Sequence, residues 1–172
     1  FVSSLYMRGI DFYNVPTTVL SQVDSSIGGK VAVNFEGVKN IIGAFHQPKG
    51  VLIDIKTLET LPERQIKNGL IEALKSGAIR DASLFEMFES EDGINYIETI
   101  IVKSLEVKRK IVENDEKESG ERKLLNFGHT IGHGIESAAH GTLFHGECVA
   151  LGMYLISGGE LKTRLKKIYE NM

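Results

Sequence analysis

Hydrophobic and polar positions follow two different rhythms along the chain. In roughly the first third, short apolar runs alternate with glycine-rich turns. Residues 12–15 predict a short strand that stops at a proline, and residues 51–55 have the length and apolar composition of a buried parallel strand. Between them, Thr17 and Thr18 are placed to cap a helix that ends at the glycine pair 28–29.

After Leu61-Pro62 the apolar residues recur at helical spacing. Residues 1–61 therefore predict the end of an α/β domain, and residues 62–172 predict an all-helical domain, which together make an α+β two-domain chain. Four helices are expected, with periodic positions at Ile66, Leu70, Ile71 and Leu74; at Ile94, Ile97, Ile100, Ile101, Leu105 and Val112; at His129, Ile131, Gly132 and Ile135; and at Val149, Leu151, Met153 and Leu155.

Composition narrows the class of protein. The 172 residues carry a formal net charge of −3 and show no basic stripe, which argues against a nucleic-acid partner. Continuous apolar runs of membrane-spanning length are lacking, so no membrane partner is expected. The single cysteine, Cys148, excludes an internal disulfide framework and suits the cytoplasm. The first eight residues lack a start methionine and a signal-peptide pattern, so we expect a chain whose front is missing.

Histidines are concentrated in one stretch of the chain. His129 and His133 are four residues apart, so on a helix they share a face and both could reach one metal ion. The same spacing also fits a polar patch or a hydrogen-bonded core pair. Glycines at 128, 132 and 134 each cost a helix about 1 kcal/mol. That cost indicates close packing or a close ligand, which favours the metal site.

A carboxylate and a lysine lie one helical turn apart in the first predicted helix. Glu72 and Lys75 are at positions i and i+3, and spacing alone favours a solvated ion pair. Apolar Ile71 and Leu74 flank Glu72, however, which indicates a carboxylate that points into a cleft. A carboxylate with two histidines is a familiar ligand set for catalytic zinc.

Two further polar segments are candidates for ligand contacts. Gly28-Gly29-Lys30 looks like a phosphate-binding loop, but Val31 stands where Ser or Thr is required. The bare motif fits a solvent-facing turn, whereas the surrounding serines, asparagines and Asp24 fit a polar ligand site. The segment 108–126 is rich in charge, and its pattern alone favours a charged helix end followed by a loop.

Taken in order, these segments resemble the 3-dehydroquinate synthase family. Each motif alone is modest, but the ordered set is specific and covers the chain from Phe1 to about Met153. Beyond Met153 the resemblance weakens, and the family's N-terminal nucleotide fold is expected ahead of Phe1. The matching text is Tyr6–Gly9, Val15–Thr18, Gln22–Lys30, Gly37–Asn40, Glu72–Lys75, Leu125–His133 and His145–Glu147.

The resemblance implies a divalent metal, zinc or cobalt, held by Glu72, His129 and His145. His133 then serves the substrate rather than the metal. NAD is implied as the cofactor, bound by a Rossmann-like domain that ends in residues 1–61. The residues that the resemblance assigns to NAD are Thr17, Thr18, Asp24, Lys30, Lys39, Thr57, Leu58, Glu59 and Thr60.

The resemblance further implies a phosphorylated sugar acid as substrate and a homodimer in which Arg8 reaches the phosphate of the neighbouring subunit. The family converts 3-deoxy-D-arabino-heptulosonate 7-phosphate to 3-dehydroquinate and phosphate, a step of the shikimate pathway to aromatic amino acids. It does so by transient oxidation, phosphate elimination, re-reduction and aldol cyclisation. Besides Arg8, the implied catalytic and substrate residues are Lys30, Asn40, Lys75, Lys108, Arg122, Asn126 and His133.

Three other functions remain open at the level of sequence. A sugar-phosphate cyclase that makes an inosose or valiolone ring shares the metal and cofactor, but Arg122, Asn126 and His133 favour the quinate branch. A metal-dependent polyol dehydrogenase of related fold usually carries Asp where Glu72 stands. A non-catalytic oligomerising protein is the third alternative, since the fragment alone could be inactive.

Overall fold

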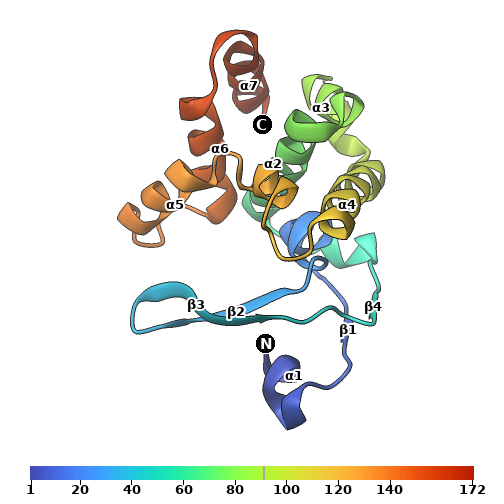
Figure 1. The fold of residues 1–172 in the computed structure, drawn as a ribbon. Coiled ribbons are helices and arrows are strands. Elements are labelled where there is room, and N and C mark those ends of the chain that lie inside the picture. The colour runs from blue at the N-terminus through green and yellow to red at the C-terminus, as the bar shows by residue number, and fades with distance from the viewer. Residues whose placement is uncertain (91) are drawn as a thin grey trace.

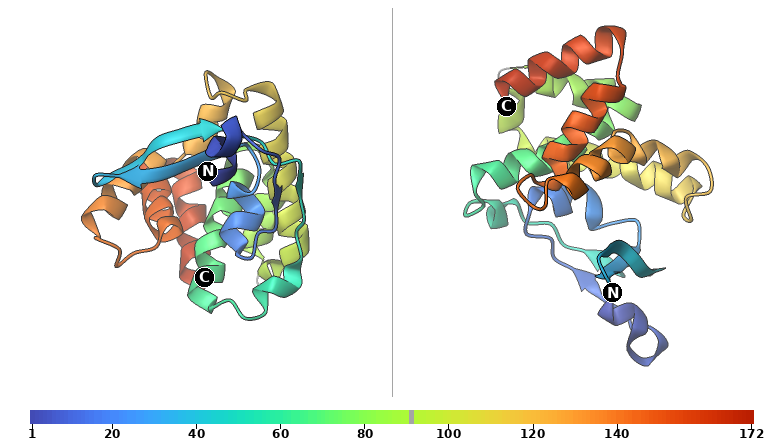
Figure 2. Two further views of the ribbon diagram at one scale, coloured as in Figure 1. Left: turned by 90° about the horizontal axis from the view of Figure 1, so that it is seen from below. Right: turned by 90° about the vertical axis from the view of Figure 1, so that its left-hand side faces the viewer.

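In a computed structural model, which describes residues 1–90 and 92–172, the N-terminal part consists of short elements. They lie below the helical part in Figure 1, with α1 and the chain's N-terminus at the opposite end of the molecule from α7. The right-hand view of Figure 2 shows the same separation. The elements are α1 (Val2–Leu5), η1 (Tyr6–Arg8), β1 (Tyr13–Asn14), η2 (Ser21–Ser25), β2 (Lys30–Phe35), β3 (Val38–Phe45), β4 (Gly50–Val51) and η3 (Ile55–Leu58).

The two predicted strands pair in parallel, but they are shorter than expected. Tyr13 pairs with Gly50 and Asn14 with Val51, and the ladder ends there. The prediction of a buried strand over 51–55 is wrong, because Leu52 is 67% exposed and the Asp54 carboxylate accepts a hydrogen bond from the Lys56 amide. That contact turns the chain into η3.

An antiparallel hairpin of β2 and β3 is the largest element that the sequence pattern did not predict. Its register joins Lys30 to Phe45 and Val33 to Ile42, and it extends beneath α5 in Figure 1. Every residue of β3 is exposed. Because both faces of this ribbon lack a covering layer, its residues do not alternate between apolar and polar, and the usual strand signal is missing.

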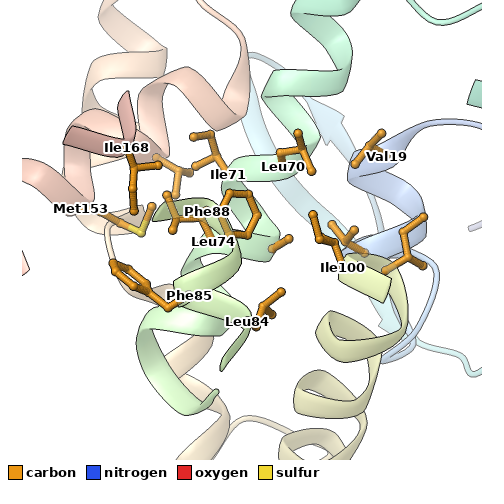
Figure 3. Packing of buried hydrophobic residues seen from close by; sticks show 14 of the residues in the cluster. Val19, Leu70, Ile71, Leu74, Leu84, Phe85, Phe88, Ile100, Met153 and Ile168 are labelled. Carbon is orange, nitrogen blue, oxygen red and sulfur yellow. The ribbon is translucent and has the colours of Figure 1, made fainter. Parts of the chain in front are cut away.

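The helical part begins with α2 and surrounds it. Residues 68–77 of α2 are buried without interruption, so this helix is enclosed on every side. Figure 3 shows Leu70, Ile71 and Leu74 of α2 packed among side chains from its neighbours, including Val19. The helices and turns are α2 (Glu63–Arg80), α3 (Ala82–Glu89), η4 (Gly93–Asn95), α4 (Ile97–Asn114), η5 (Glu121–Asn126), α5 (His129–Ala138), α6 (His145–Ile156) and α7 (Gly159–Asn171).

The four predicted helices correspond to α2, α4, α5 and α6, while α3 and α7 were not predicted. The expected order, an α/β part followed by an all-helical part, is confirmed. Thr18 does cap the short helical segment before the glycine pair, because its Oγ1 accepts from the Ser21 amide at 3.2 Å. Within the described residues, none of the helices is long and apolar enough to cross a membrane.

Candidate metal and substrate site

The buried helix α2 carries two charged side chains in its centre. Glu72 and Lys75 are 1% and 2% exposed, and the Lys75 ammonium forms an ion pair with Glu72 Oε2. The expectation of a solvated pair is therefore wrong, and the inference drawn from the flanking apolar residues is the better one. Burying a charge is costly unless it is paired, so this arrangement indicates a site rather than a stabilising surface contact.

The second carboxylate oxygen of Glu72 faces two histidines. Oε1 is buried and lacks a hydrogen-bond partner among the described residues. It lies 3.4 Å from His145 Nε2 and 3.6 Å from His129 Nε2. Backbone carbonyl Phe127 O lies 3.2 Å from His129 Nδ1 and so orients that ring. One carboxylate oxygen and two imidazole nitrogens that converge in this way match the ligand set of an open zinc site.

Close packing of α5 on α6 brings the two histidines together. A Cβ on Gly152 would lie 2.0 Å from the Gly128 carbonyl oxygen, and one on Gly132 would lie 2.9 Å from the Cys148 carbonyl oxygen. Gly128 itself has φ +79°, a conformation that favours glycine. Two of the three glycines that reduce helix propensity are thus explained by packing. Gly134 is not, since nothing lies within 4 Å of the Cβ it lacks.

The electrostatics of the cluster favour the metal-binding forms of two of the three proposed ligands, Glu72 and His129. Burial acts to raise the pKa of Glu72, but the Lys75 charge and the contacts with His145 and His129 hold that pKa below its ordinary value. Burial and the Lys75 charge lower the pKa of His129 to about 4. The contact with Glu72 raises the pKa of His145. Near neutral pH, Glu72 is an anion and His129 is neutral, and both are ligand forms.

A pocket of about 360 Å³ opens next to this cluster. It draws residues from both parts of the chain: from η2, from the hairpin, from the buried helix, and from the segment 108–145. Five cationic side chains and one carboxylate line it, so cations predominate among its lining side chains. The lining residues are Asp24, Lys30, Lys39, Asn40, Lys75, Lys108, Arg122, Leu125, Asn126, His129, His133 and His145.

Hairpin residues reach the pocket through contacts with the helical part. Lys30 forms an ion pair with Glu118, and the Lys39 ammonium lies 2.7 Å from Glu136 Oε2. Asn40 adopts φ +55°, and its amide donates to the Asn34 side chain at 2.9 Å. The strand pairing is irregular at this point, between Val33 and Phe35, and Asn40 lines the pocket.

Lys108 and Arg122 are buried rather than solvated. Lys108 Nζ lies 2.9 Å from Asp24 Oδ1, and Arg122 Nη2 donates to the Gly28 carbonyl at 2.7 Å. Arg122 Nε is buried and lacks a partner in the described part of the chain. Residues 108–126 do contain a helix end followed by a loop, since α4 ends at Asn114, but Lys108 and Arg122 pack against the turn at Gly28. The expected solvent-facing glycine turn is therefore wrong.

Some residues that the resemblance assigned to the site do not line this pocket. Thr17, Thr18 and the segment Thr57, Leu58, Glu59 and Thr60 are not among its lining residues. Gln22 donates to the carbonyls of Pro16 and Asp54 and to Thr57 Oγ1, and so ties these segments together. Arg8 is exposed in η1, away from the pocket.

Sequence reasoning missed one acidic residue of the site. Glu136 contacts both Lys39 and His145. It follows His129 by seven residues, two helical turns, and it shares a face with His133 three residues before it. That spacing could have identified it.

Comparison with known proteins gives the same family over both parts of the chain. Residues 1–68 match the family described as 3-dehydroquinate synthase N-terminal, and residues 69–169 match 3-dehydroquinate synthase C-terminal, a match that extends beyond Met153. The 3-dehydroquinate synthase of Thermoanaerobacter pseudethanolicus is 56% identical over 163 residues, which cover 89% of this chain and 45% of that protein. That of Pelobacter propionicus is 49% identical over 162 residues, covering 90% and 45%. The chain spans about half the length of the curated relatives it matches.

Solved structures of two other synthases share the fold. The 2-epi-5-epi-valiolone synthase of Streptomyces hygroscopicus, solved with NAD⁺ and Zn²⁺, matches with a TM-score of 0.90 at 30% identity, over 98% of this chain and 52% of that one. A 2-deoxy-scyllo-inosose synthase, solved with carbaglucose-6-phosphate, NAD⁺ and Co²⁺, matches with a TM-score of 0.86 at 30% identity, over 97% and 51%. Because the two family matches together cover residues 1–169, and the fold and the pocket agree with them, the chain belongs to the 3-dehydroquinate synthase family.

Proposed function

We propose that this chain supplies the metal- and substrate-binding half of a 3-dehydroquinate synthase. The reaction is conversion of 3-deoxy-D-arabino-heptulosonate 7-phosphate to 3-dehydroquinate and phosphate in the shikimate pathway. One observation carries the proposal: five cationic side chains line a single pocket next to a buried carboxylate and two histidines. A neutral polyol does not need so many cations, whereas a substrate with a carboxylate and a phosphate does.

A divalent metal, zinc or cobalt, is proposed to bind Glu72, His129 and His145. The unpartnered Glu72 Oε1 supports this, and so do the Zn²⁺ and Co²⁺ of the two structural neighbours. Bound there, the metal supplies a Lewis acid that lowers the pKa of a substrate hydroxyl. Lys75 keeps Oε2 of Glu72 occupied, so that Oε1 alone is presented to the metal.

NAD is the proposed redox cofactor, as it is in both structural neighbours. When bound, it accepts a hydride and returns it, so the reaction has no net redox change. Its proposed contacts from this chain are Asp24, Lys30 and Lys39 in the pocket, and Thr17, Thr18, Thr57, Leu58, Glu59 and Thr60 outside it. We further propose that residues 1–61 are the C-terminal part of the NAD-binding domain and that residues 62–172 form the metal and substrate domain.

Substrate groups are proposed to contact the remaining pocket residues. The planar guanidinium of Arg122 suits a bidentate grip on carboxylate or phosphate, and its Nε is a donor without a partner in the described chain. Lysines neutralise the second anionic group, the asparagine amides bind hydroxyls, and His133 binds a hydroxyl or transfers a proton. These residues are Lys30, Asn40, Lys75, Lys108, Asn126 and His133.

Assembly and location complete the proposal. Arg8 lies outside the pocket of its own chain, which agrees with a role at the pocket of a second subunit in a homodimer. A cytoplasmic location agrees with the single, buried Cys148.

The sugar-phosphate cyclases remain the second candidate because both structural neighbours are of that kind. Their 30% identity is well below the 49% and 56% of the dehydroquinate synthases.

Phosphate release and NADH absorbance, followed in one assay, test the proposed reaction. The substrate is 3-deoxy-D-arabino-heptulosonate 7-phosphate, added to this chain and to the chain extended to the length of its relatives. Phosphate release without NADH accumulation is expected from the extended protein. Stoichiometric NADH without phosphate would identify a dehydrogenase, and no turnover by either form would favour the non-catalytic alternative.

A further inference from the structure

A second carboxylate lies behind the proposed metal ligand His145. Glu136 of α5 places Oε2 at 3.3 Å from His145 Nδ1. Both oxygens of the same carboxylate accept hydrogen bonds from the Lys39 ammonium, with Nζ at 2.8 Å from Oε1 and 2.7 Å from Oε2. Its side chain is 24% exposed. Glu136 therefore contacts a metal ligand on one side and the hairpin strand β3 on the other.

The two ring nitrogens of His145 face different partners. Nε2 lies 3.4 Å from the unpartnered Glu72 Oε1, whereas Nδ1 faces Glu136. A metal-bound imidazole binds through a nitrogen without a proton, so the other nitrogen carries the N–H and needs an acceptor. His129 has the equivalent arrangement, since its Nδ1 faces the Phe127 carbonyl. Each proposed histidine ligand thus has an acceptor behind it.

We propose that Glu136 is a positioning residue for the metal site. Its carboxylate accepts the Nδ1–H of His145 and so keeps Nε2 directed at the metal position. Through Lys39, the same carboxylate fixes the hairpin to the helix that carries His129. This inference rests on the proposed metal site at Glu72, His129 and His145.

Glu136 could instead be a ligand itself, because His133, Glu136 and His145 also form a cluster of metal-ligand type. Two observations oppose that arrangement. Both oxygens of Glu136 already accept from the Lys39 ammonium, so neither is free for a metal ion. Glu72 Oε1, in contrast, is buried and lacks a protein partner among the described residues.

Cobalt titration of the full chain in competition with a chelator tests the inference. Glu136→Ala is expected to weaken Co²⁺ binding by about 10- to 100-fold, the usual cost of removing an acceptor behind a histidine ligand. The stoichiometry and the visible Co²⁺ spectrum should stay those of the wild type, because the three ligands are unchanged. Glu136→Gln should lose less affinity, since its amide oxygen can still accept from Nδ1–H.

Controls separate this inference from the metal site on which it rests. Glu86→Gln, an exposed position on α3, should leave Co²⁺ affinity unchanged, and thermal unfolding without metal checks that each variant folds. Unchanged affinity in Glu136→Ala, with binding lost in Glu72→Ala, would overturn the positioning role and leave the metal site standing. An altered Co²⁺ spectrum or complete loss of binding in Glu136→Ala would make Glu136 a ligand and overturn the role as well. Retained binding in Glu72→Ala would overturn the metal site itself.

Discussion

The N-terminal and helical parts of the chain bury their apolar side chains very differently. Only three of the 20 buried hydrophobic residues, Val19, Val23 and Leu58, come from residues 1–61. The same residues supply 15 of the 21 large hydrophobic side chains that are exposed. The helical part therefore has a core of its own around α2, whereas the N-terminal part is attached to it and leaves its apolar surface uncovered.

This contrast explains how the two parts contribute to one pocket. Glu72 and His145 stand on helices α2 and α6, which contribute to the core, and α5 with His129 packs closely on α6. Lys30 and Lys39 depend on ion pairs with side chains of the helical part, and these pairs are partly exposed. Exposed pairs contribute little stability, so the hairpin side of the pocket should be the softer side.

The largest expected effect is at the buried ion pair of α2. Glu72→Ala leaves the Lys75 ammonium buried without its partner, which should lower the free energy of unfolding by about 3–5 kcal/mol. It should also abolish metal binding, because the central ligand is removed. Urea unfolding and zinc titration measure the two effects separately.

A double variant and a surface pair serve as controls for that prediction. Glu72→Leu combined with Lys75→Met removes both charges and should recover much of the stability while metal binding stays lost. Asp11→Ala breaks an exposed pair with Lys49 in the N-terminal part and should cost under about 1 kcal/mol. A cost at Asp11 equal to that at Glu72 would contradict the proposed difference between the two parts.

The next largest effect is the loss of stability when an apolar side chain is truncated in the helical part, compared with the same change in the N-terminal part. Leu74→Ala removes a fully buried side chain and should cost about 2–5 kcal/mol. Ile41→Ala, at a hairpin position that is 59% exposed, should change stability by no more than about 0.5 kcal/mol. Chemical denaturation of both variants measures the difference. A large loss at Ile41 would show that the hairpin is covered in solution.

The difference in burial between the helical part and the N-terminal part also explains which elements could be predicted from the sequence. Helical periodicity identified α2 and α4 because one core shapes both, and the apolar neighbours of Glu72 indicated its burial. The hairpin was missed because its exposed faces impose no alternation on residues such as Ile41 and Ile42. The burial of Lys108 and Arg122 was not predicted from the pattern, because their partners, Asp24 and the Gly28 carbonyl, are distant in sequence. Pairing over such separations is set by the tertiary fold.

Cofactor binding by the N-terminal part should be weak in this chain alone. NAD usually places its pyrophosphate at a glycine-rich turn before a helix N-terminus, and no such turn occurs in these 172 residues. Calorimetry with NAD is expected to give a dissociation constant well above the micromolar range. Micromolar affinity would show that Asp24, Lys30 and Lys39, together with the threonines, suffice.

The smallest effect concerns the loop that places Arg122. Amide hydrogen bonds from Arg122, Gly120 and Ser119 lower the pKa of Asp115 from 3.8 to about 2. Because the folded pKa is the lower one, the stability it contributes is present above about pH 4 and is lost as the pH falls towards 2. The deficit of Asp115→Asn should shrink over that range in denaturant titrations. A deficit independent of pH would contradict this role of the carboxylate.

The position of zinc in a crystal of the chain, located by anomalous scattering at the zinc edge, tests the proposed metal site most directly. One zinc site per chain is expected, with Glu72 Oε1, His129 Nε2 and His145 Nε2 each at about 2.0–2.2 Å from the metal. His133 and Glu136 should remain outside the coordination sphere. A zinc ion held by His133, Glu136 and His145, with Glu72 not bound, would contradict the central claim.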